Sequence, residues 1–200
     1  MKQTLLSAFL FFAVIASQAQ VTVKPGIRAG ANFSKITSTD FDYRPAFYVG
    51  GFVAVKLTRF YTLQPEINYS SQGAKANVVY LIANQNYYAE QNISIGYLSF
   101  AMINRFTFSD QFDLHFGPTL DFQTDSNTYT NSDVDLAFTA GVGYTLPFGL
   151  TIEARVKKGI VDVLESDSYN ESYNYVDDWN TNLVFQVGAS YKFDVKGATK

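Results

Sequence analysis

Residues 61–73 read YTLQPEINYSSQG, and the character of their side chains alternates at every second position. The odd positions are mostly apolar, whereas the even positions are all polar and include one carboxylate, Glu66. A period of two indicates a β-strand with one apolar face and one polar face. The alternation alone does not say which face meets water. In a soluble barrel the apolar face points inward, and in a membrane barrel it points outward.

Seven other stretches show the same alternation, which makes eight predicted strands. They span residues 26–34, 47–57, 93–108, 112–123, 134–146, 150–162 and 183–193. Each is long enough to cross a membrane, which takes about 9–11 residues. Tight turns near residues 58–60, 109–111 and 147–149 alternate with long polar connections at 36–46, 74–92, 124–133 and 163–182. One end of an up-and-down barrel would therefore carry short turns and the other long loops, as in bacterial outer-membrane barrels.

The composition favours the membrane barrel. Charged residues make up 16% of the chain, well below the roughly 25% of soluble proteins, and aromatic residues make up another 16%. Aromatic residues near strand ends also resemble the girdles at the two membrane interfaces. These residues are Phe47, Tyr61, Phe108, Phe112, Phe122, Tyr144 and Phe193. The alternative is a soluble exported lipocalin-like barrel that binds an apolar ligand.

The first twenty residues, MKQTLLSAFLFFAVIASQAQ, differ from the rest of the chain. A basic residue, Lys2, precedes an apolar run over residues 5–16, and small residues follow up to Ala19. This order predicts a secretory signal peptide at residues 1–19 that is cleaved after Ala19. The apolar run is shorter than the ~20 residues of a membrane-spanning helix. No linker divides the remainder, so residues 20–200 are predicted to form a single outer-membrane β-barrel domain.

LQPEINYSSQGAK, at residues 63–75, resembles a signature of the PorT-like outer-membrane β-barrel family of Bacteroidetes. Further matching pieces are GIRAGANFS (26–34), GYLSFAMINRFTF (96–108), FGPTLDF (116–122), GVGYTLPFGLTIEARVKKGIVDV (141–163) and FQVGASYKF (185–193). The resemblance implies an all-β fold, an eight-stranded antiparallel up-and-down transmembrane barrel in the outer membrane, with short periplasmic turns and long extracellular loops. The family's namesake takes part in protein secretion, so a barrel subunit of an outer-membrane secretion machine is an alternative function.

The polar faces of the predicted strands would bring charged residues together inside the barrel. The candidates are Arg28, Glu66, Asp113, His115, Asp121, Glu153, Arg155 and Lys157, with Lys56, Arg105 and Lys192 as further basic partners. A buried charge must be paired to offset its desolvation, so we expect a structural polar network with Glu66 beside Arg28 or Arg155. An eight-stranded lumen leaves no aqueous channel. A narrow proton or ion pathway is the alternative interpretation.

No stretch of the sequence indicates a catalytic, cofactor-binding or metal site. The chain has no Cys and a single His, His115, so a transition-metal site would lack its usual ligands. No nucleophile motif accompanies His115, as hydrolase chemistry would require. We therefore expect a protein that is not an enzyme and needs no cofactor, with an outer-membrane enzyme as the alternative. The net charge of −3 argues against nucleic acid as a partner.

The last long connection, VLESDSYNESYNYVDDW at residues 163–179, is acidic and rich in aromatic side chains. Tyr and Trp are favoured at interfaces, so a protein partner is expected to contact Tyr169, Tyr173, Tyr175 and Trp179. Its carboxylates suit Ca²⁺, although their spacing matches no calcium-loop motif, and a simple solvated loop is the plainer interpretation.

Two local features of the opening strand lead to further predictions. Proline cannot donate to a strand ladder, so we predict a bulge or a missing hydrogen bond at Pro65. The connection at residues 74–92 contains the apolar run VVYLIA and is predicted to extend two strands beyond the membrane as a hairpin. Together the observations predict a small outer-membrane barrel with a closed polar lumen. Its role would be structural or adhesive, with outer-membrane lipid and a protein at the extracellular loops as partners.

Overall fold

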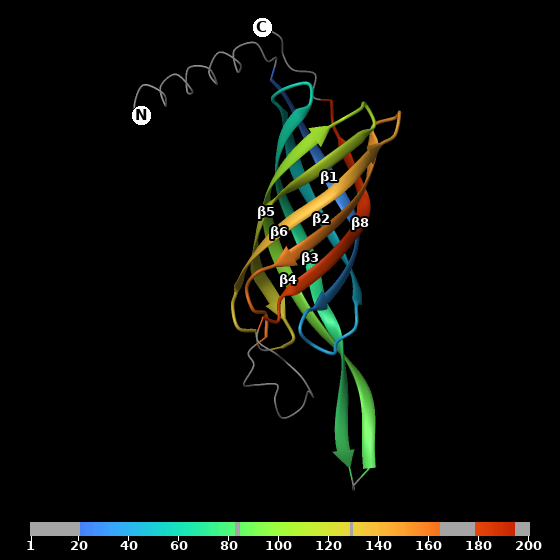
Figure 1. Ribbon diagram of the computed structural model, residues 1–200, viewed down its shortest axis with the longest axis vertical. Coiled ribbons are helices and arrows are strands. Elements are labelled where there is room, and N and C mark those ends of the chain that lie inside the picture. Colours follow the sequence, from blue (N-terminus) through green and yellow to red (C-terminus); the bar gives the residue numbers. More distant parts are fainter. Residues whose placement is uncertain (1–20, 83–84, 129, 165–178, 195–200) are drawn as a thin grey trace, which may run out of the picture.

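The computed structural model describes residues 21–82, 85–128, 130–164 and 179–194 of the 200-residue chain. Within these ranges eight antiparallel strands pair in chain order, and β1 also pairs with β8, so the sheet closes into a barrel (Figure 1). The predicted fold class is therefore confirmed. No helix among these residues is long and apolar enough to cross a membrane. The strands are β1 (Thr22–Ile36), β2 (Arg44–Lys56), β3 (Tyr61–Ile82), β4 (Gln85–Thr107), β5 (Phe112–Ser126), β6 (Val134–Thr145), β7 (Leu150–Gly159) and β8 (Asn182–Lys192).

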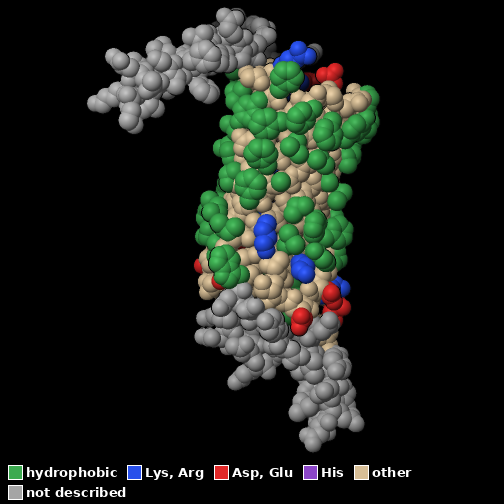
Figure 2. Space-filling view, viewed as in Figure 1, with side chains coloured by type: hydrophobic (Ala, Val, Ile, Leu, Met, Phe, Trp, Pro, Cys, Tyr) green, Lys and Arg blue, Asp and Glu red, His purple; other side chains and the backbone are tan. Residues whose placement is uncertain are grey.

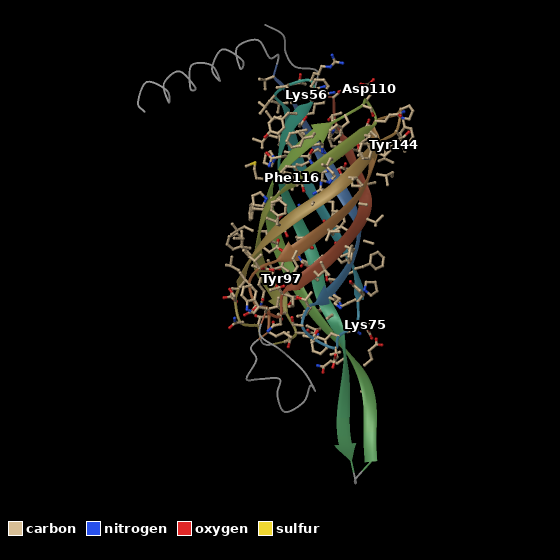
Figure 3. All side chains as sticks on the ribbon, in the orientation of Figure 1. Lys56, Lys75, Tyr97, Asp110, Phe116 and Tyr144 are labelled. Carbon is tan, nitrogen blue, oxygen red and sulfur yellow. The ribbon has the colours of Figure 1, made fainter. Side chains whose placement is uncertain are left out.

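The two ends of the barrel differ as the connection lengths predict. The turn end carries the short connections at residues 57–60, 108–111 and 146–149, and the loop end carries the longer ones. Lys56 and Asp110 lie at the turn end, and Lys75 lies at the loop end (Figure 3). Gly149 closes one tight turn with a φ of +92°, which favours glycine because a Cβ is strained there.

The outer wall of the barrel is apolar (Figure 2). The interior is polar. Two consecutive residues of the opening strand show the contrast, because Ile67 is 47% exposed and Glu66 is 4% exposed. Large apolar side chains point outward from all eight strands, while the carboxylates, arginines and amides of the alternate positions are buried. This arrangement suits lipid outside and side-chain pairing inside. The alternative of a soluble lipocalin-like barrel is therefore wrong.

Asn104 interrupts the apolar outer face of β4, and its polar atoms are hydrogen-bonded. The Tyr61 hydroxyl donates to Asn104 Oδ1 at 2.7 Å, and Asn104 Nδ2 donates to the carbonyl of Phe116 at 3.3 Å. Aromatic rings surround this amide on the outer wall. The ring centre of Phe106 lies 5.2 Å from that of Tyr61 and 5.6 Å from that of Phe116. These contacts shield an outward amide that lipid could not hydrogen-bond.

The ladder between β2 and β3 is interrupted at Pro65. Pairing runs to Phe52↔Glu66 and resumes at Val55↔Leu63 in the same register. On the other side of β3, Pro65 pairs regularly with Met102. The prediction of missing hydrogen bonds at Pro65 is therefore confirmed for one ladder, whereas a bulge at this residue is wrong, since the register does not shift.

Pro118 on β5 repeats the same arrangement. The β4–β5 ladder lacks the pairs between Ala101↔Thr119 and Asn104↔Phe116, while Pro118 pairs with Phe138 on β6. The register shift in this sheet lies instead at Gly96/Tyr97, near the loop end. Each proline thus keeps one ladder intact, because an extended residue turns its missing N–H toward only one neighbour.

Strands β3 and β4 continue past the rim of the barrel as a two-stranded ribbon (Figure 1). We call residues 77–90 the ribbon, since their pairing runs in register from Asn77↔Glu90 to Ile82↔Gln85. The predicted hairpin extension is confirmed.

The interior at the loop end is apolar, which the prediction of a closed polar lumen did not include. Side chains from several strands and connections form one buried cluster there. Its members are Ile36, Phe41, Ala74, Ala76, Ile93, Ile95, Tyr97, Val163 and Leu164. The rims of long strands supply inward positions beyond the charged layer, and apolar residues fill them without needing polar partners. This loop-end cluster fills the lumen at the end of the barrel from which the ribbon extends.

Candidate functional site

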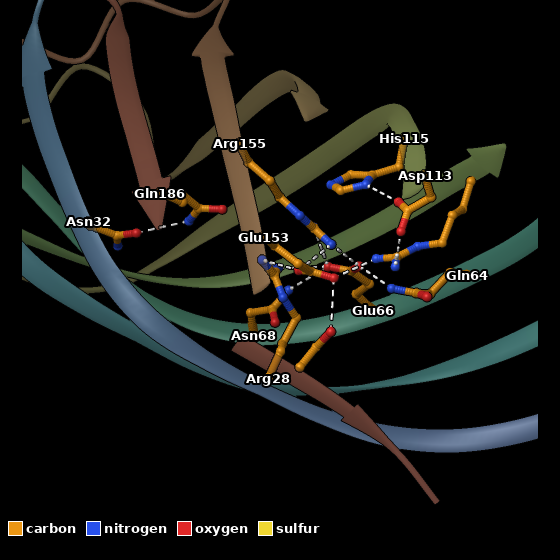
Figure 4. A network of polar contacts seen from close by, with 12 residues as sticks. Arg28, Asn32, Gln64, Glu66, Asn68, Asp113, His115, Glu153, Arg155 and Gln186 are labelled. Carbon is orange, nitrogen blue, oxygen red and sulfur yellow. Dashed lines mark hydrogen bonds and ion pairs between the residues drawn. The ribbon is translucent and has the colours of Figure 1, made fainter. Parts of the chain in front are cut away.

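The middle of the lumen holds a network of charged side chains (Figure 4), which come from five strands. Residues two apart on a strand share a face, so single strands deliver pairs of groups to the interior. Strand β7 delivers Glu153 and Arg155, and β5 delivers Asp113 and His115. Arg28 comes from β1, Glu66 from β3 and Arg105 from β4. All of these side chains are buried.

Glu66 lies at the centre of this network. Arg155 donates to both of its carboxylate oxygens at 2.9 Å, and Arg28 donates to Oε2 at 2.8 Å. Gln64 Nε2 adds a bond of 2.8 Å to Oε1. The carboxylate is thus paired and saturated with donors, which is what burial of a charge requires.

Glu153 forms a second centre beside Glu66. Arg105 donates to Oε1 at 2.5 Å, and Arg155 donates to Oε2 at 3.1 Å. Ser190 donates to Oε1 at 2.9 Å. Arg28 Nη2 lies 3.5 Å from Oε2. Each arginine therefore contacts at least two groups of the network, and the carboxylates are linked through them.

Asp113 completes the charge balance of the network. Arg105 donates to its Oδ2 at 3.0 Å, and His115 Nδ1 lies 2.7 Å from its Oδ1. Three arginines thus face three carboxylates, so the cluster is neutral when His115 is neutral. Such balance lets the charges stay buried without a counter-ion from solution.

Lys157 and Asp121 form a separate pair nearer the loop end, with Nζ 2.5 Å from Oδ2. Gln72 also donates to Asp121 Oδ2 at 3.3 Å. Asp135 lies beyond this pair, where Asn182 Nδ2 is 3.4 Å from its Oδ2. This layer joins the charged network to the apolar loop-end cluster.

The side chains leave almost no free volume in the middle of the lumen. The cavity between the two charged layers measures about 20 Å³, room for about one water molecule. In the described ranges no three His, Asp or Glu side chains gather in a way that would hold a metal ion. The geometry therefore supports a filled interior that links strands across the barrel.

The eight lumen residues named from the sequence are all buried inside the barrel. The structure joins six of them in one network and sets Asp121 and Lys157 apart as a pair. Lys56 and Lys192 lie beside a cavity at the turn end instead. Tyr48 was missed, although its ring lies 4.5 Å below Arg28 Cζ. Tyr48 lies between Phe47 and Val49, which point outward on β2. Strand alternation could therefore have predicted that Tyr48 points into the lumen.

The predicted contact residues of the last loop fall mostly outside the described residues. Tyr169, Tyr173 and Tyr175 lie there, as do the loop carboxylates considered for Ca²⁺ and the predicted signal peptide. Trp179 is described, and it is 74% exposed with a φ of +72°. The next residue, Asn180, is buried and accepts hydrogen bonds from the backbone N–H groups of Val163 and Leu164. Asn180 thus ties the end of this loop to the loop-end cluster.

A closed antiparallel barrel with an apolar wall and a filled polar interior defines a small outer-membrane β-barrel. The chain belongs to the family described as outer membrane protein beta-barrel domain, whose profile matches residues 16–199. The protein is accordingly placed in the outer membrane.

Solved outer-membrane barrels resemble this chain over most of its length. Neisserial surface protein A (NspA) is 13% identical, with 86% of this chain and 97% of that chain covered and a TM-score of 0.50. OprG from Pseudomonas aeruginosa is 13% identical, with 89% and 99% covered and a TM-score of 0.48. Ail of Yersinia pestis is 11% identical, with 86% and 97% covered and a TM-score of 0.47. At this identity the likeness to NspA shows the fold alone. A comparison with curated proteins gives no match.

Proposed function

We propose that the protein is a non-enzymatic outer-membrane anchor that presents a contact surface outside the cell. The barrel provides the anchor, and the ribbon at residues 77–90 provides the surface. The observation that carries the proposal is the β3–β4 ladder, which continues to Ile82↔Gln85 beyond the rim.

The ribbon offers two unpaired strand edges. In the described part of the chain no strand other than β3 and β4 pairs with it. Such edges expose backbone N–H and C=O groups that accept a further strand. A two-stranded ribbon is also only marginally stable by itself. A partner that adds a strand would therefore order the ribbon and bind through its backbone.

The filled lumen supports an anchoring role rather than transport. The charged network links β1, β3, β4, β5 and β7 across the interior, and the loop-end cluster covers it. A solute would have to displace both layers. The cavity of about 20 Å³ between the two charged layers is too small to pass it.

The proposal is tested by cross-linking in living cells. A photoreactive residue is placed at ribbon positions in one set of variants and at turn position 59 in a control variant. We expect defined protein adducts from the ribbon and none from the turn. In a further variant an Asn-Gly turn joins Ala76 to Gln91, and it should lose partner binding while the barrel still folds. A folded barrel without ribbon adducts contradicts the proposal.

A subunit of a secretion machine is the second candidate, and the resemblance of residues 63–75 to the PorT-like family of Bacteroidetes supports it. Such a subunit would form a stable complex that survives extraction from native membranes. Co-purification of defined partners with both the parent and the ribbon-shortened variant favours this candidate. If the partners co-purify with the parent but not with the ribbon-shortened variant, the result favours the ribbon as a contact surface.

A further inference from the structure

Two lysines lie side by side on the outer wall near the loop end. Lys35 on β1 pairs with Leu183 on β8, and Leu183 pairs in turn with Lys158 on β7. Adjacent strands are ~4.8 Å apart, so the backbones of the two lysines are about 10 Å apart. Both residues alternate with buried neighbours, Ser34 next to Lys35 and Lys157 next to Lys158. Their side chains therefore leave the wall toward lipid and not toward the lumen.

The surroundings of these lysines contain hydroxyls and rings, and the carboxylate that acts electrostatically on Lys158, Asp135, is buried and forms no ion pair with it in the described part of the chain. Lys158 Nζ donates to Thr37 Oγ1 at 2.8 Å and to Thr181 Oγ1 at 2.5 Å. Lys35 Nζ lies 5.4 Å from the ring centre of Tyr43. Among the described residues no carboxylate lies within 4.0 Å of either amine. The pair thus forms a patch of two positive charges, which we call the lysine pair.

The lysine pair lies on the loop-end part of the apolar wall. Toward the turn end, the same outer faces carry exposed apolar residues, Phe33 on β1 and Val156 on β7. Toward the loop end, Thr37 and Thr181 follow beyond β1 and β8, whereas Ile160, which follows Lys158, is again apolar and exposed. Figure 2 shows basic side chains on the outer wall toward the loop end, flanked by apolar side chains. Because long loops lie outside the cell in such barrels, this part of the wall faces the outer leaflet.

We propose that the lysine pair binds the phosphate groups of a phosphorylated glycolipid of the outer leaflet. Two ammonium groups without carboxylate partners complement a phosphate, to which Lys binds as a point charge. The ring of Tyr43, 5.9 Å from that of Phe185, lies beside the pair, where aromatic residues favour the boundary between acyl chains and headgroups. The site would hold one lipid against β1, β7 and β8.

Basic residues at the opposite end provide a matched control. Lys24 and Lys56 lie at the turn end beside a cavity of about 160 Å³ that opens into the lumen. Lys24 is already paired with Asp194. Replacing these two residues changes the net charge as much as replacing the lysine pair. The change then lies at the turn end, on the inward side of the wall.

The test measures binding of fluorescent lipid A to the full-length barrel in nonionic detergent micelles. We expect K35Q/K158Q to bind about 25-fold more weakly, since each lysine near an anionic surface contributes roughly fivefold. K24Q/K56Q should bind like the parent, and K35R/K158R should retain binding. Equal affinity of K35Q/K158Q and the parent, or an equal loss in K24Q/K56Q, overturns the proposal.

Competing ligands identify the source of the phosphate. Unlabelled lipid A should displace the probe, whereas dephosphorylated lipid A, phosphatidylglycerol and inorganic phosphate should not. Displacement by phosphatidylglycerol or inorganic phosphate to the same degree as by lipid A overturns the assignment to a glycolipid. A second measurement needs no variant: lipid A should protect Lys35 and Lys158, but not Lys56, from an amine-acetylating reagent. Unprotected acetylation of Lys35 and Lys158 contradicts the site even if the glutamine variants fail to fold.

Discussion

Arg155 on β7 reaches across the lumen and donates two parallel hydrogen bonds, each 2.9 Å long, to the carboxylate of Glu66 on β3. The two residues are 89 positions apart in the chain. A bidentate arginine–carboxylate pair fixes both distance and orientation. This pair therefore links strands that share no ladder, and it holds the shape of the barrel as well as its charge balance.

Glu66→Gln should destabilise the barrel by about 3–5 kcal/mol, because it leaves Arg28 and Arg155 buried without their shared carboxylate. Urea unfolding of the barrel in lipid vesicles measures the change. Asp110→Asn, at an exposed turn position, is the control and should change the free energy of unfolding by less than about 0.5 kcal/mol. Adding Arg155→Gln to Glu66→Gln should cost less than the sum of the two single changes. Strict additivity would show that the pair is not coupled.

Gly188→Ala should destabilise the barrel by about 1–3 kcal/mol through overpacking. A Cβ at this position would lie 2.2 Å from Tyr48 Oη and 2.3 Å from the carbonyl oxygen of Ala29, so the backbone would have to move. Gly51→Ala is the matched control, because a Cβ there would meet only the carbonyl oxygen of Gly26, at 3.5 Å. Thermal unfolding monitored by migration of unheated samples on SDS gels compares the two. Equal midpoints for both variants would be inconsistent with the close approach.

Pro65→Val should restore hydrogen bonding between β2 and β3. The new N–H faces the gap between Phe52↔Glu66 and Val55↔Leu63, and one added hydrogen bond stabilises by about 1 kcal/mol. Hydrogen exchange of the Val53 amide, which faces this gap, should slow about fivefold relative to the parent. Pro118→Val, which acts on the β4–β5 gap, should leave that amide unchanged. Unaltered exchange in Pro65→Val would mean that proline does not cause the gap.

The parent barrel should conduct no ions across planar lipid bilayers, because its lumen is filled by paired side chains and covered by the loop-end cluster. Current recordings at low and high salt measure this, with an open porin as the positive control. Steady conductance steps from purified protein would contradict a closed lumen and would favour the alternative of an ion pathway.

Much of the fold was predictable because strand periodicity needs only local information. The opening stretch assigned Glu66 and Ile67 to opposite faces without knowledge of any other strand. Alternating short and long connections then predicted the turn end and the loop end. The apolar loop-end cluster was not predictable in this way. Ile93 and Ile95 share the inward face of β4 with Arg105, but only closure of the barrel brings them together with Ile36 and Leu164.

The sequence predicted which residues belong to the candidate site but not how they pair. Charged residues on polar faces could be named, and Glu66 could be matched with Arg28 or Arg155 as alternatives. The structure shows that both arginines bind it at once. It also shows that Arg105 joins Asp113 to Glu153 and that Lys157 joins Asp121 instead. Local patterns carry no signal for these choices.

The sequence by itself determined the eight strands, the two faces of each and the end that bears the long loops. Side-chain period, turn length and composition depend on neighbours along the chain, and they can be judged without a fold. The tertiary structure alone decided which charges meet, where the lumen turns apolar and that Lys35 and Lys158 share one patch of the wall. These relationships depend on closure and on the stagger between strands, which bring together residues that lie far apart in the chain.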